Sequence, residues 1–160
     1  MTDFSTADLC DKYDNDIQVL TPMYYSYGGV SKFSGKISTC KIIDNNTELL
    51  KLLKTEGYGR VCVVDVEAKY IAVVGDKLMD FAKQNNWAGI LVNGYIRDTQ
   101  TIKTINVGLI ALGTCPKKVA IINSGECGID LNFSNVNFIE NHHLYADTDG
   151  VIVSPLPLEM

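Results

Sequence analysis

Two short charged segments, each after an apolar run, are the residues of this sequence best suited to chemistry. Gly75-Asp76 follows the apolar run at residues 70–74, and the run at residues 89–93 leads through Gly94 to Arg97-Asp98. An arginine can hold a carboxylate through two parallel hydrogen bonds, and an aspartate offers oxygen ligands to a hard cation such as Mg²⁺. These residue types therefore suit an anionic ligand bound beside a divalent metal ion.

The elements between the two segments must bring them together. The 20 residues between Asp76 and Arg97 have room for one helix, a return and one strand, the length of a βαβ crossover. Such crossovers join parallel strands, so both segments are expected at the carboxyl edge of the sheet, where open α/β sheets bind ligands. Free amides at the start of the helix suit a carboxylate there. The expected substrate-binding residues are Gly75, Asp76, Lys77, Leu78 and Arg97.

Each of these residues also has a simpler interpretation. Asp76 and Asp98 both stand where a helix is expected to begin, and an N-capping aspartate is commoner than a metal ligand. Arg97 could be a surface arginine, and Gly75 and Gly94 could be turn glycines. The spacing alone leaves both interpretations open.

The rest of the sequence predicts one α/β domain with a mixed sheet over residues 1–160. Short apolar runs that alternate with helical stretches indicate strands buried on both faces. Helices are predicted over residues 5–13, 47–56, 76–86 and 99–104, and a structured loop over 23–35. Strands are predicted over residues 37–43, 61–66, 70–74, 89–93, 107–112, 119–123, 129–133, 136–139 and 151–153.

Composition excludes several classes of protein. No apolar stretch approaches the roughly 20 residues of a membrane helix, and the acidic N-terminus lacks the features of a secretory signal, which predicts a cytoplasmic protein. The net charge of −5 opposes direct binding to nucleic acid, because phosphate binding depends on clustered Lys and Arg. The widely spaced cysteines form no CxxC pair and are predicted to be reduced core thiols. They are Cys10, Cys40, Cys62, Cys115 and Cys127.

Several motifs spread over nearly the whole chain are jointly specific. They are Gly28-Gly29 with Phe33 and Gly35, Gly59-Arg60-Val61, Val64-Asp65, Gly75-Asp76-Lys77-Leu78, Asn93-Gly94, Ile96-Arg97-Asp98, residues 111–116, residues 143–147 and Asp149-Gly150-Val151. With these motifs the chain resembles the family named for the regulator of ribonuclease activity A (RraA). This family also contains 4-hydroxy-4-methyl-2-oxoglutarate aldolases that decarboxylate oxaloacetate. The resemblance implies a compact, swivelling β/β/α domain assembled as a homotrimeric ring, with sites near subunit contacts.

The resemblance also implies roles for individual residues. Catalytic members of the family carry an aspartate, then twenty residues, then Arg-Asp, and in this chain that pattern falls on Asp76, Arg97 and Asp98. Members that act only as regulators tend to lose the second aspartate. By this resemblance Asp98 would bind Mg²⁺ or Mn²⁺, Arg97 would stabilise an enolate, and Asp76 would position a water that carries the proton. The enzymes often carry an acidic residue three positions after the metal aspartate, and here that position is Thr101.

Three functions follow as expectations from this resemblance. The first is a divalent-metal-dependent lyase, a class II aldolase that acts on pyruvate-derived keto acids and decarboxylates oxaloacetate. The alternative is a regulator without catalysis, an acidic ring that masks the basic RNA-binding region of ribonuclease E or its helicase partners. The third is a trimeric scaffold with a vestigial site, which Thr101 keeps open.

Other candidate residues have weaker support. His142 and His143 are adjacent, so they would not share a face of a helix or strand, and a structural role is preferred to metal binding. Cys115 has no evident base partner for a nucleophilic thiol. Asp147 and Asp149 precede a glycine and resemble a turn, with a supporting role behind the site as the alternative.

Overall fold

The computed structural model describes residues 3–118 and 124–160. The helices are α1 (Thr6–Tyr13), α2 (Thr47–Leu53), α3 (Asp76–Gln84) and α4 (Thr99–Ile102), with a short 3₁₀ turn, η1 (Asp14–Asp16). The strands of the first half are β1 (Gln18–Val19), β2 (Tyr25–Ser26), β3 (Phe33–Lys41), β4 (Val61–Asp65), β5 (Ala72–Val74) and β6 (Gly89–Ile96). Those of the second half are β7 (Gly108–Thr114), β8 (Glu126–Cys127), β9 (Leu131–Phe133), β10 (Val136–Phe138), β11 (His143–Ala146) and β12 (Val151–Ser154).

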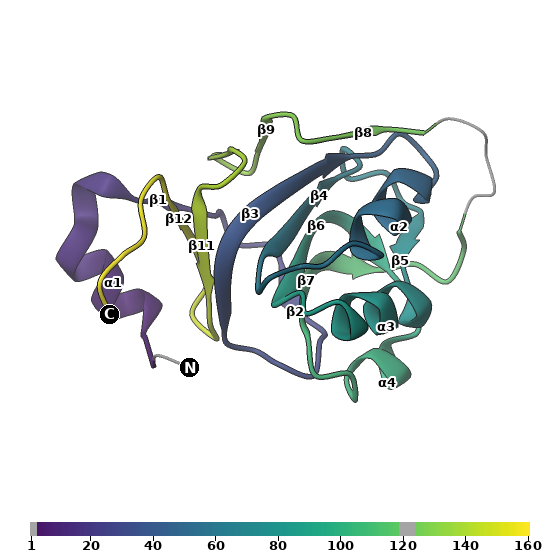
Figure 1. The fold of residues 1–160 in the computed structure, drawn as a ribbon, viewed down its shortest axis with the longest axis horizontal. Coiled ribbons are helices and arrows are strands. Elements are labelled where there is room, and N and C mark those ends of the chain that lie inside the picture. Colours follow the sequence, from purple (N-terminus) through teal and green to yellow (C-terminus); the bar gives the residue numbers. More distant parts are fainter. Residues whose placement is uncertain (1–2, 119–123) are drawn as a thin grey trace.

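Ten of these strands form one mixed sheet (Figure 1). Its order is β1-β12-β11-β3-β4-β6-β7-β2, with β5 paired to β6 and β8 paired to β3, while β9 and β10 form a separate hairpin. The central strands β3, β4, β6 and β7 are parallel. Strand β3 joins two parts of the sheet, because residues 33–36 pair with β11 and residues 37–41 pair with β4. The predicted α/β class with a mixed sheet is confirmed.

The core lies on both faces of the parallel strands. Helices α2 and α3 cover one face (Figure 1), where Leu49, Leu53 and Met79 are fully buried. On the other face the strands pack against the second half of the chain, including Phe138 and Leu144. Helix α1 lies at the far end beside β11 and β12 and makes a smaller apolar cluster of its own. The result is a layer of helices, a parallel sheet and a further β layer.

Several predicted boundaries need correction. Residues 23–35, predicted as a loop, contain β2 and the start of β3, and β11 was not predicted at all. The reason at Phe33 is tertiary packing: its ring fills the space above Gly89 and Gly108, where a Cβ would come within 2.4 and 2.2 Å of it. Such a contact between distant positions leaves no periodic signal in the sequence. The strand predicted at residues 119–123 lies outside the described residues.

The cysteines also differ from the prediction. Cys40 and Cys127 are joined in a disulfide, so the prediction of five reduced thiols is wrong for this pair. The two residues are partners across the antiparallel strands β3 and β8, and their sequence separation of 87 hid that proximity. Cys10, Cys62 and Cys115 are free, and burial raises the pKa of the Cys62 thiol far above its ordinary value.

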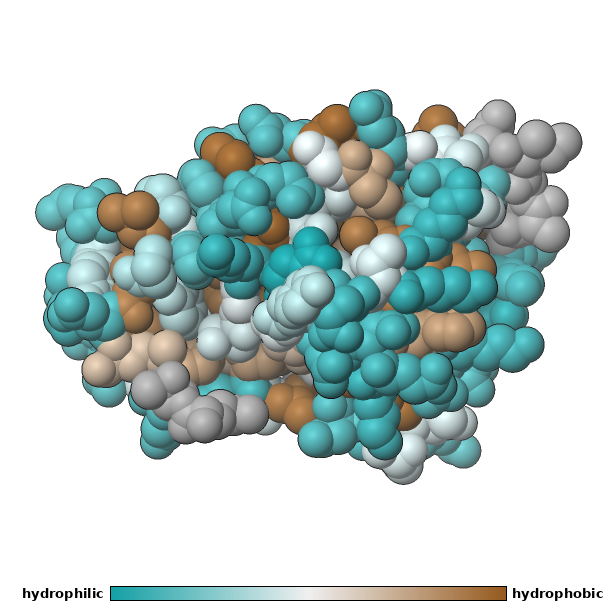
Figure 2. All heavy atoms as spheres, viewed as in Figure 1, coloured by the Kyte–Doolittle hydropathy of each residue, from teal (hydrophilic) through white to brown (hydrophobic). Residues whose placement is uncertain are grey.

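The surface is mainly polar on the face that carries α2 and α3. Figure 2 shows hydrophilic residues over most of this face, with hydrophobic residues in small, separate patches. Within residues 3–118 and 124–160, no helix has the length and apolar character needed to cross a membrane.

Candidate active site

The β5-α3-β6 unit brings the two charged segments to one edge of the sheet. Strands β5 and β6 are parallel neighbours, and the Arg97 amide donates a hydrogen bond to the carbonyl of Val74 at 3.0 Å. Gly75 is the extended N-cap residue of α3, and Asp76 is the first residue of that helix. The structure therefore places Asp76 and Arg97 together at the carboxyl ends of adjacent strands, as the crossover spacing predicted.

Asp98 links the two segments directly. Its Oδ2 atom accepts a hydrogen bond from the Asp76 amide at 3.2 Å and lies 4.0 Å from Nε of Arg97. Its backbone is left-handed, with φ of 64°, and its side chain makes no capping bond to its own helix α4. The simple N-cap interpretation therefore does not describe Asp98, because its carboxylate reaches across to the start of the neighbouring helix α3.

Gly75 is required by this contact. A Cβ atom at position 75 would lie 2.6 Å from Oδ2 of Asp98, closer than real Cβ contacts allow. Its φ of −131° is ordinary extended backbone, so the glycine serves close approach rather than an unusual turn. Gly75 and Asp98 form one unit in which the missing side chain makes room for the carboxylate.

The first amides of α3 already hold anionic oxygens. The Asp76 amide binds Oδ2 of Asp98, and the Lys77 amide binds Oδ1 of Asp76 at 2.8 Å. A helix N-terminus favours negative charge, and two carboxylates of the protein occupy it here. A substrate carboxylate at these amides would have to exchange with the side-chain oxygens.

Two hollows meet at Arg97 and Asp98. One has a volume of about 270 Å³ and the other about 300 Å³, a size suited to a small molecule. The first is lined by Asn46, Leu50, residues 72–78, Phe81, Arg97, Asp98 and Lys118, and the second by residues 96–99 and 114–116. The Arg97 side chain is 35% exposed and donates to the Pro116 carbonyl at 3.5 Å, which leaves most of its donors available.

The first hollow combines charges of both signs. Lys77, Arg97 and Lys118 outnumber Asp76 and Asp98, so this part of the surface is locally positive in a chain of net charge −5. An anionic ligand is favoured by that balance.

Two polar residues that line this hollow were missed by the sequence analysis. Asn46, whose side chain donates to the Val73 carbonyl at 3.0 Å, directly precedes helix α2, where an asparagine is common without any role in a site. Lys118 carried no distinguishing signal, because its place beside β5 depends on the whole fold.

The donor set fits a hard cation that keeps most of its water. Among the described residues no group of three or more His, Cys, Asp and Glu side chains is gathered as a metal cage. Asp98 is 39% exposed at the hollow, and Asp76, whose amide donates to Oδ2 of Asp98, lines the same hollow. Mg²⁺ and similar ions are bound by one or two carboxylates together with waters and substrate oxygens, whereas Zn²⁺ favours nitrogen and sulfur cages. Asp98 would hold such an ion.

The other sequence candidates have local structural contacts, except that Nδ1 of His142 is buried without a hydrogen-bond partner among the described residues. Cys115 is buried, and its thiol faces the carbonyls of Tyr70 and Lys117. His143 pairs with Lys36 across β11 and β3, and burial together with that lysine lowers its pKa.

Asp147 ties the N-terminus to β11. Its carboxylate accepts hydrogen bonds from the amide and hydroxyl of Thr6 and from the amide of Asp149. The turn predicted around Asp149 and Gly150 is present. The contacts of Asp147 therefore serve the attachment of the N-terminal segment, not the hollow at Asp98.

Parallel strands with charged residues at their carboxyl edge and a helix start beside a small hollow define an α/β protein with a candidate anion-binding site. The chain belongs to the RraA-like family, Aldolase/RraA, whose model matches residues 6–153.

Similar proteins support this assignment over nearly the whole length. A relative from Laribacter hongkongensis, provisionally named 4-hydroxy-4-methyl-2-oxoglutarate aldolase, is 43% identical over 98% of this chain and 99% of its own. The RNA-processing inhibitor RraA from Thermus thermophilis superposes with a TM-score of 0.93 and 33% identity, covering 99% and 96% of the two chains. A Geobacillus kaustophilus structure titled S-adenosylmethionine: 2-dimethylmenaquinone methyltransferase also has a TM-score of 0.93, with 36% identity and 97% coverage of both.

Proposed function

We propose that this protein is a divalent-metal-dependent carbon–carbon lyase that acts on pyruvate-derived keto acids. Its substrates would be 4-hydroxy-4-methyl-2-oxoglutarate, cleaved as an aldol, and oxaloacetate, which would be decarboxylated. The observation that carries the proposal is the contact of Asp98 with both Arg97 and the start of α3 at one hollow. The provisional aldolase name of the 43% identical relative supports the same reaction class.

The chemistry places negative charge on one oxygen. Both reactions break the bond between C3 and C4 of the keto acid, and its electron pair moves into a pyruvate enolate. The other fragment leaves as CO₂ from oxaloacetate, or as pyruvate from the aldol once its C4 hydroxyl has given its proton to water. A Mg²⁺ or Mn²⁺ ion held by Asp98 would supply Lewis acidity for this charge. Arg97 would bind the substrate carboxylate and add a fixed positive charge near the developing oxyanion.

The remaining groups would orient the substrate and carry the proton. The amides at the start of α3, from Gly75 to Leu78, would bind the carboxylate in exchange for the side-chain oxygens that occupy them. Asp76 would hold a water that protonates the enolate carbon. Lys77, which is exposed, adds positive charge at the rim of the hollow without a covalent role.

A metal-dependence assay tests the proposal. Protein treated with EDTA should decarboxylate oxaloacetate only after Mg²⁺ or Mn²⁺ is added. Asp98→Asn should lower this turnover about 100-fold or more, because Lewis-acid stabilisation contributes several kcal/mol to such reactions. Asp80→Asn, on an exposed position of the same helix α3, is the matched control and should keep full activity. Turnover that is independent of metal and of Asp98 would exclude the proposal.

The geometry of Arg97 is tested separately. Arg97→Lys keeps the charge but loses the two-pronged hydrogen bonding of the guanidinium, so kcat/KM should fall at least about tenfold. Equal activity in the lysine variant would show that charge alone suffices at this position.

Regulation of a ribonuclease is the second candidate function. It is favoured by the match to the Thermus RNA-processing inhibitor, and the net charge of −5 suits a basic protein surface. We propose ribonuclease E or its helicase partners as the target, bound by a homotrimer of this chain. Light scattering should give three times the 17.6 kDa chain mass. Binding to ribonuclease E that is equal for wild type and Asp98→Asn would separate this function from catalysis.

A further inference from the structure

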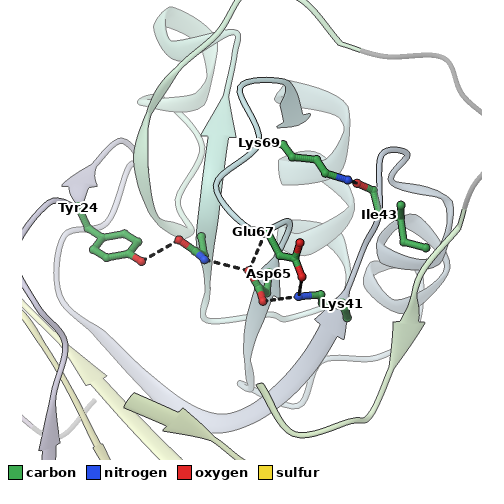
Figure 3. A network of polar contacts seen from close by, with 7 residues as sticks. Tyr24, Lys41, Ile43, Asp65, Glu67 and Lys69 are labelled. Carbon is green, nitrogen blue, oxygen red and sulfur yellow. Dashed lines mark hydrogen bonds and ion pairs between the residues drawn. The ribbon is translucent and has the colours of Figure 1, made fainter. Parts of the chain in front are cut away.

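A polar network surrounds the buried carboxylate of Asp65 at the end of β4 (Figure 3). The side chain of Asp65, the last residue of β4, is only 5% exposed. Its Oδ2 accepts from Nζ of Lys41 at 2.7 Å, and its Oδ1 accepts from the Glu67 amide at 2.8 Å and from Nδ2 of Asn93 at 2.9 Å. Both carboxylate oxygens are therefore engaged by three donors from three segments.

Further contacts extend the network in both directions. On one side, the Tyr24 hydroxyl donates to Oδ1 of Asn93 at 3.0 Å (Figure 3). On the other side, Lys41 also pairs with Glu67 at 3.0 Å, and Nζ of Lys69 donates to the Ile43 carbonyl at 2.8 Å. The segment that leaves β4 is thus tied to β3, to β6 and to the segment after β3.

The turn that follows Asp65 has an unfavourable backbone. Glu67 and Ala68 are consecutive residues with φ of 54° and 57°, a left-handed region that disfavours side chains with a Cβ atom. Such conformations persist where surrounding contacts determine them, and they occur often at functional sites. Here the Glu67 amide is held by Asp65, and the Ala68 amide donates to the Asn93 carbonyl at 3.2 Å.

This turn lies between β4 and β5, two strands that pair with successive parts of β6. Strand β4 pairs with β6 as far as the Asp65–Asn93 pair, and β5 takes over from the Ala72–Tyr95 pair onward. The backbone is tightly packed at the change, since a Cβ on Gly94 would lie 2.4 Å from a methyl carbon of Val66. The position of the turn therefore sets the position of β5, and β5 leads directly into Gly75.

We propose that Asp65 is a positioning residue for the candidate site. Its carboxylate fixes the left-handed turn, the turn fixes β5, and β5 holds Gly75 and Asp76 at the distance from Asp98 that the site requires. Lys41 acts in the same way through Asp65. The proposal rests on the proposed lyase function only for its kinetic readout, because the placement of Gly75 and Asp76 is measured without turnover.

The principal variant is Asp65→Asn. It replaces one acceptor oxygen of Asp65 by an NH₂ group, which then faces a donor instead of accepting from it. The expected results are displaced ¹H–¹⁵N signals of the Gly75 and Asp76 amides and a kcat/KM for oxaloacetate lowered about 10- to 100-fold. The dissociation constant for Mn²⁺ should stay within about twofold, because Asp98 follows β6 rather than β5. General destabilisation would not separate metal affinity from kcat/KM in this way.

Asp147→Asn is the matched control. Asp147 also accepts three hydrogen bonds, from Thr6 and Asp149, but at the N-terminal attachment. Its substitution should leave the Gly75 signal, the Mn²⁺ affinity and kcat/KM unchanged. If Asp65→Asn does not fold, Lys41→Met provides the same test, and Lys41→Arg should restore both the amide signals and the kinetics because it keeps the charge.

The outcomes are distinguishable. Wild-type protein without metal-dependent turnover would refute the lyase, while the amide signals of Gly75 and Asp76 would still decide the positioning role. Signals that move at Glu67 and Ala68 but stay in place at Gly75 and Asp76 would overturn the proposal, since the network would then hold only its own turn. Unchanged kcat/KM in an active enzyme would overturn it as well.

Discussion

Two aspartates at the ends of neighbouring strands have opposite surroundings. Asp65 ends β4 with a side chain 5% exposed, and three donors occupy its carboxylate. Asp98 follows β6 with a side chain 39% exposed, and among the described residues the Asp76 amide is its hydrogen-bond donor. A saturated, buried carboxylate can only organise the backbone around it, whereas an exposed one with few donors retains oxygens for a ligand.

The difference arises from strand length. Asp65 lies opposite Asn93, and β6 continues beyond that pair to Ile96 before the chain reaches Asp98. Asp98 therefore lies beyond the part of β6 that pairs with β4, and its carboxylate lines the hollow beside α3. A strand followed by aspartate is one pattern in sequence, yet it serves support in one place and a candidate ligand site in the other.

The largest expected effect is a contrast in stability between the two aspartates. Asp65→Ala should lower the free energy of unfolding by about 3 kcal/mol, because two amide donors lose their acceptor and the partly buried Lys41 keeps only the exposed Glu67 as a partner. That loss corresponds to a Tm about 6–12 °C lower. Asp98→Ala should move Tm by only a few degrees. Urea unfolding of both variants checks the contrast, and equal losses would remove the distinction between supporting and ligand-binding aspartates.

A second effect is expected on activity alone. Gly75→Ala places a methyl group where Oδ2 of Asp98 lies, so the carboxylate must move away from the start of α3. Displacement of this size should lower kcat/KM for oxaloacetate about 10- to 100-fold. Steady-state kinetics at saturating Mg²⁺ provide the measurement. A fully active alanine variant would show that the contact between Asp98 and Asp76 has no part in turnover.

The sequence predicted which edge of the sheet carries the candidate site, but not the contacts of Asp98 within that site. The crossover spacing correctly placed Asp76 and Arg97 together, because a parallel βαβ unit leaves little freedom to that geometry. It did not reveal that Asp98 would reach the Asp76 amide, since that contact depends on a left-handed residue and on the absence of a side chain at Gly75.

Elements set by long-range pairing were the ones missed. Strand β11 pairs with β12, its neighbour in sequence, but its other partner, β3, lies far away near the start of the chain. The Cys40–Cys127 disulfide has the same origin, as it depends on the pairing of β3 with β8. Local patterns carry no information on which distant segment will supply a partner.

A smaller effect would sharpen the role of Asp65 as a support. Ala68→Gly relieves the left-handed backbone that the Asp65 network imposes, so it should raise stability by about 1 kcal/mol, or about 2–4 °C in Tm. Ala7→Gly, at an exposed position of α1, is the matched control: φ is not positive at Ala7, so glycine should destabilise there through added chain entropy. Thermal unfolding that shows loss in both variants would contradict a strained turn.

The smallest effect concerns Asp147, whose partly exposed carboxylate accepts three hydrogen bonds. Burial raises its pKa, but hydrogen bonds from Thr6 and Asp149 outweigh burial and hold the pKa below its ordinary value. Since the folded pKa is the lower one, Asp147 stabilises the protein above the unfolded pKa of about 3.9 and loses that contribution as pH falls through the folded value. The Tm difference between wild type and Asp147→Asn should therefore be present at pH 6 and shrink toward pH 3. A difference that is constant over this range would mean that ionisation of Asp147 does not contribute, and that hydrogen bonding alone, without charge, attaches the N-terminal segment.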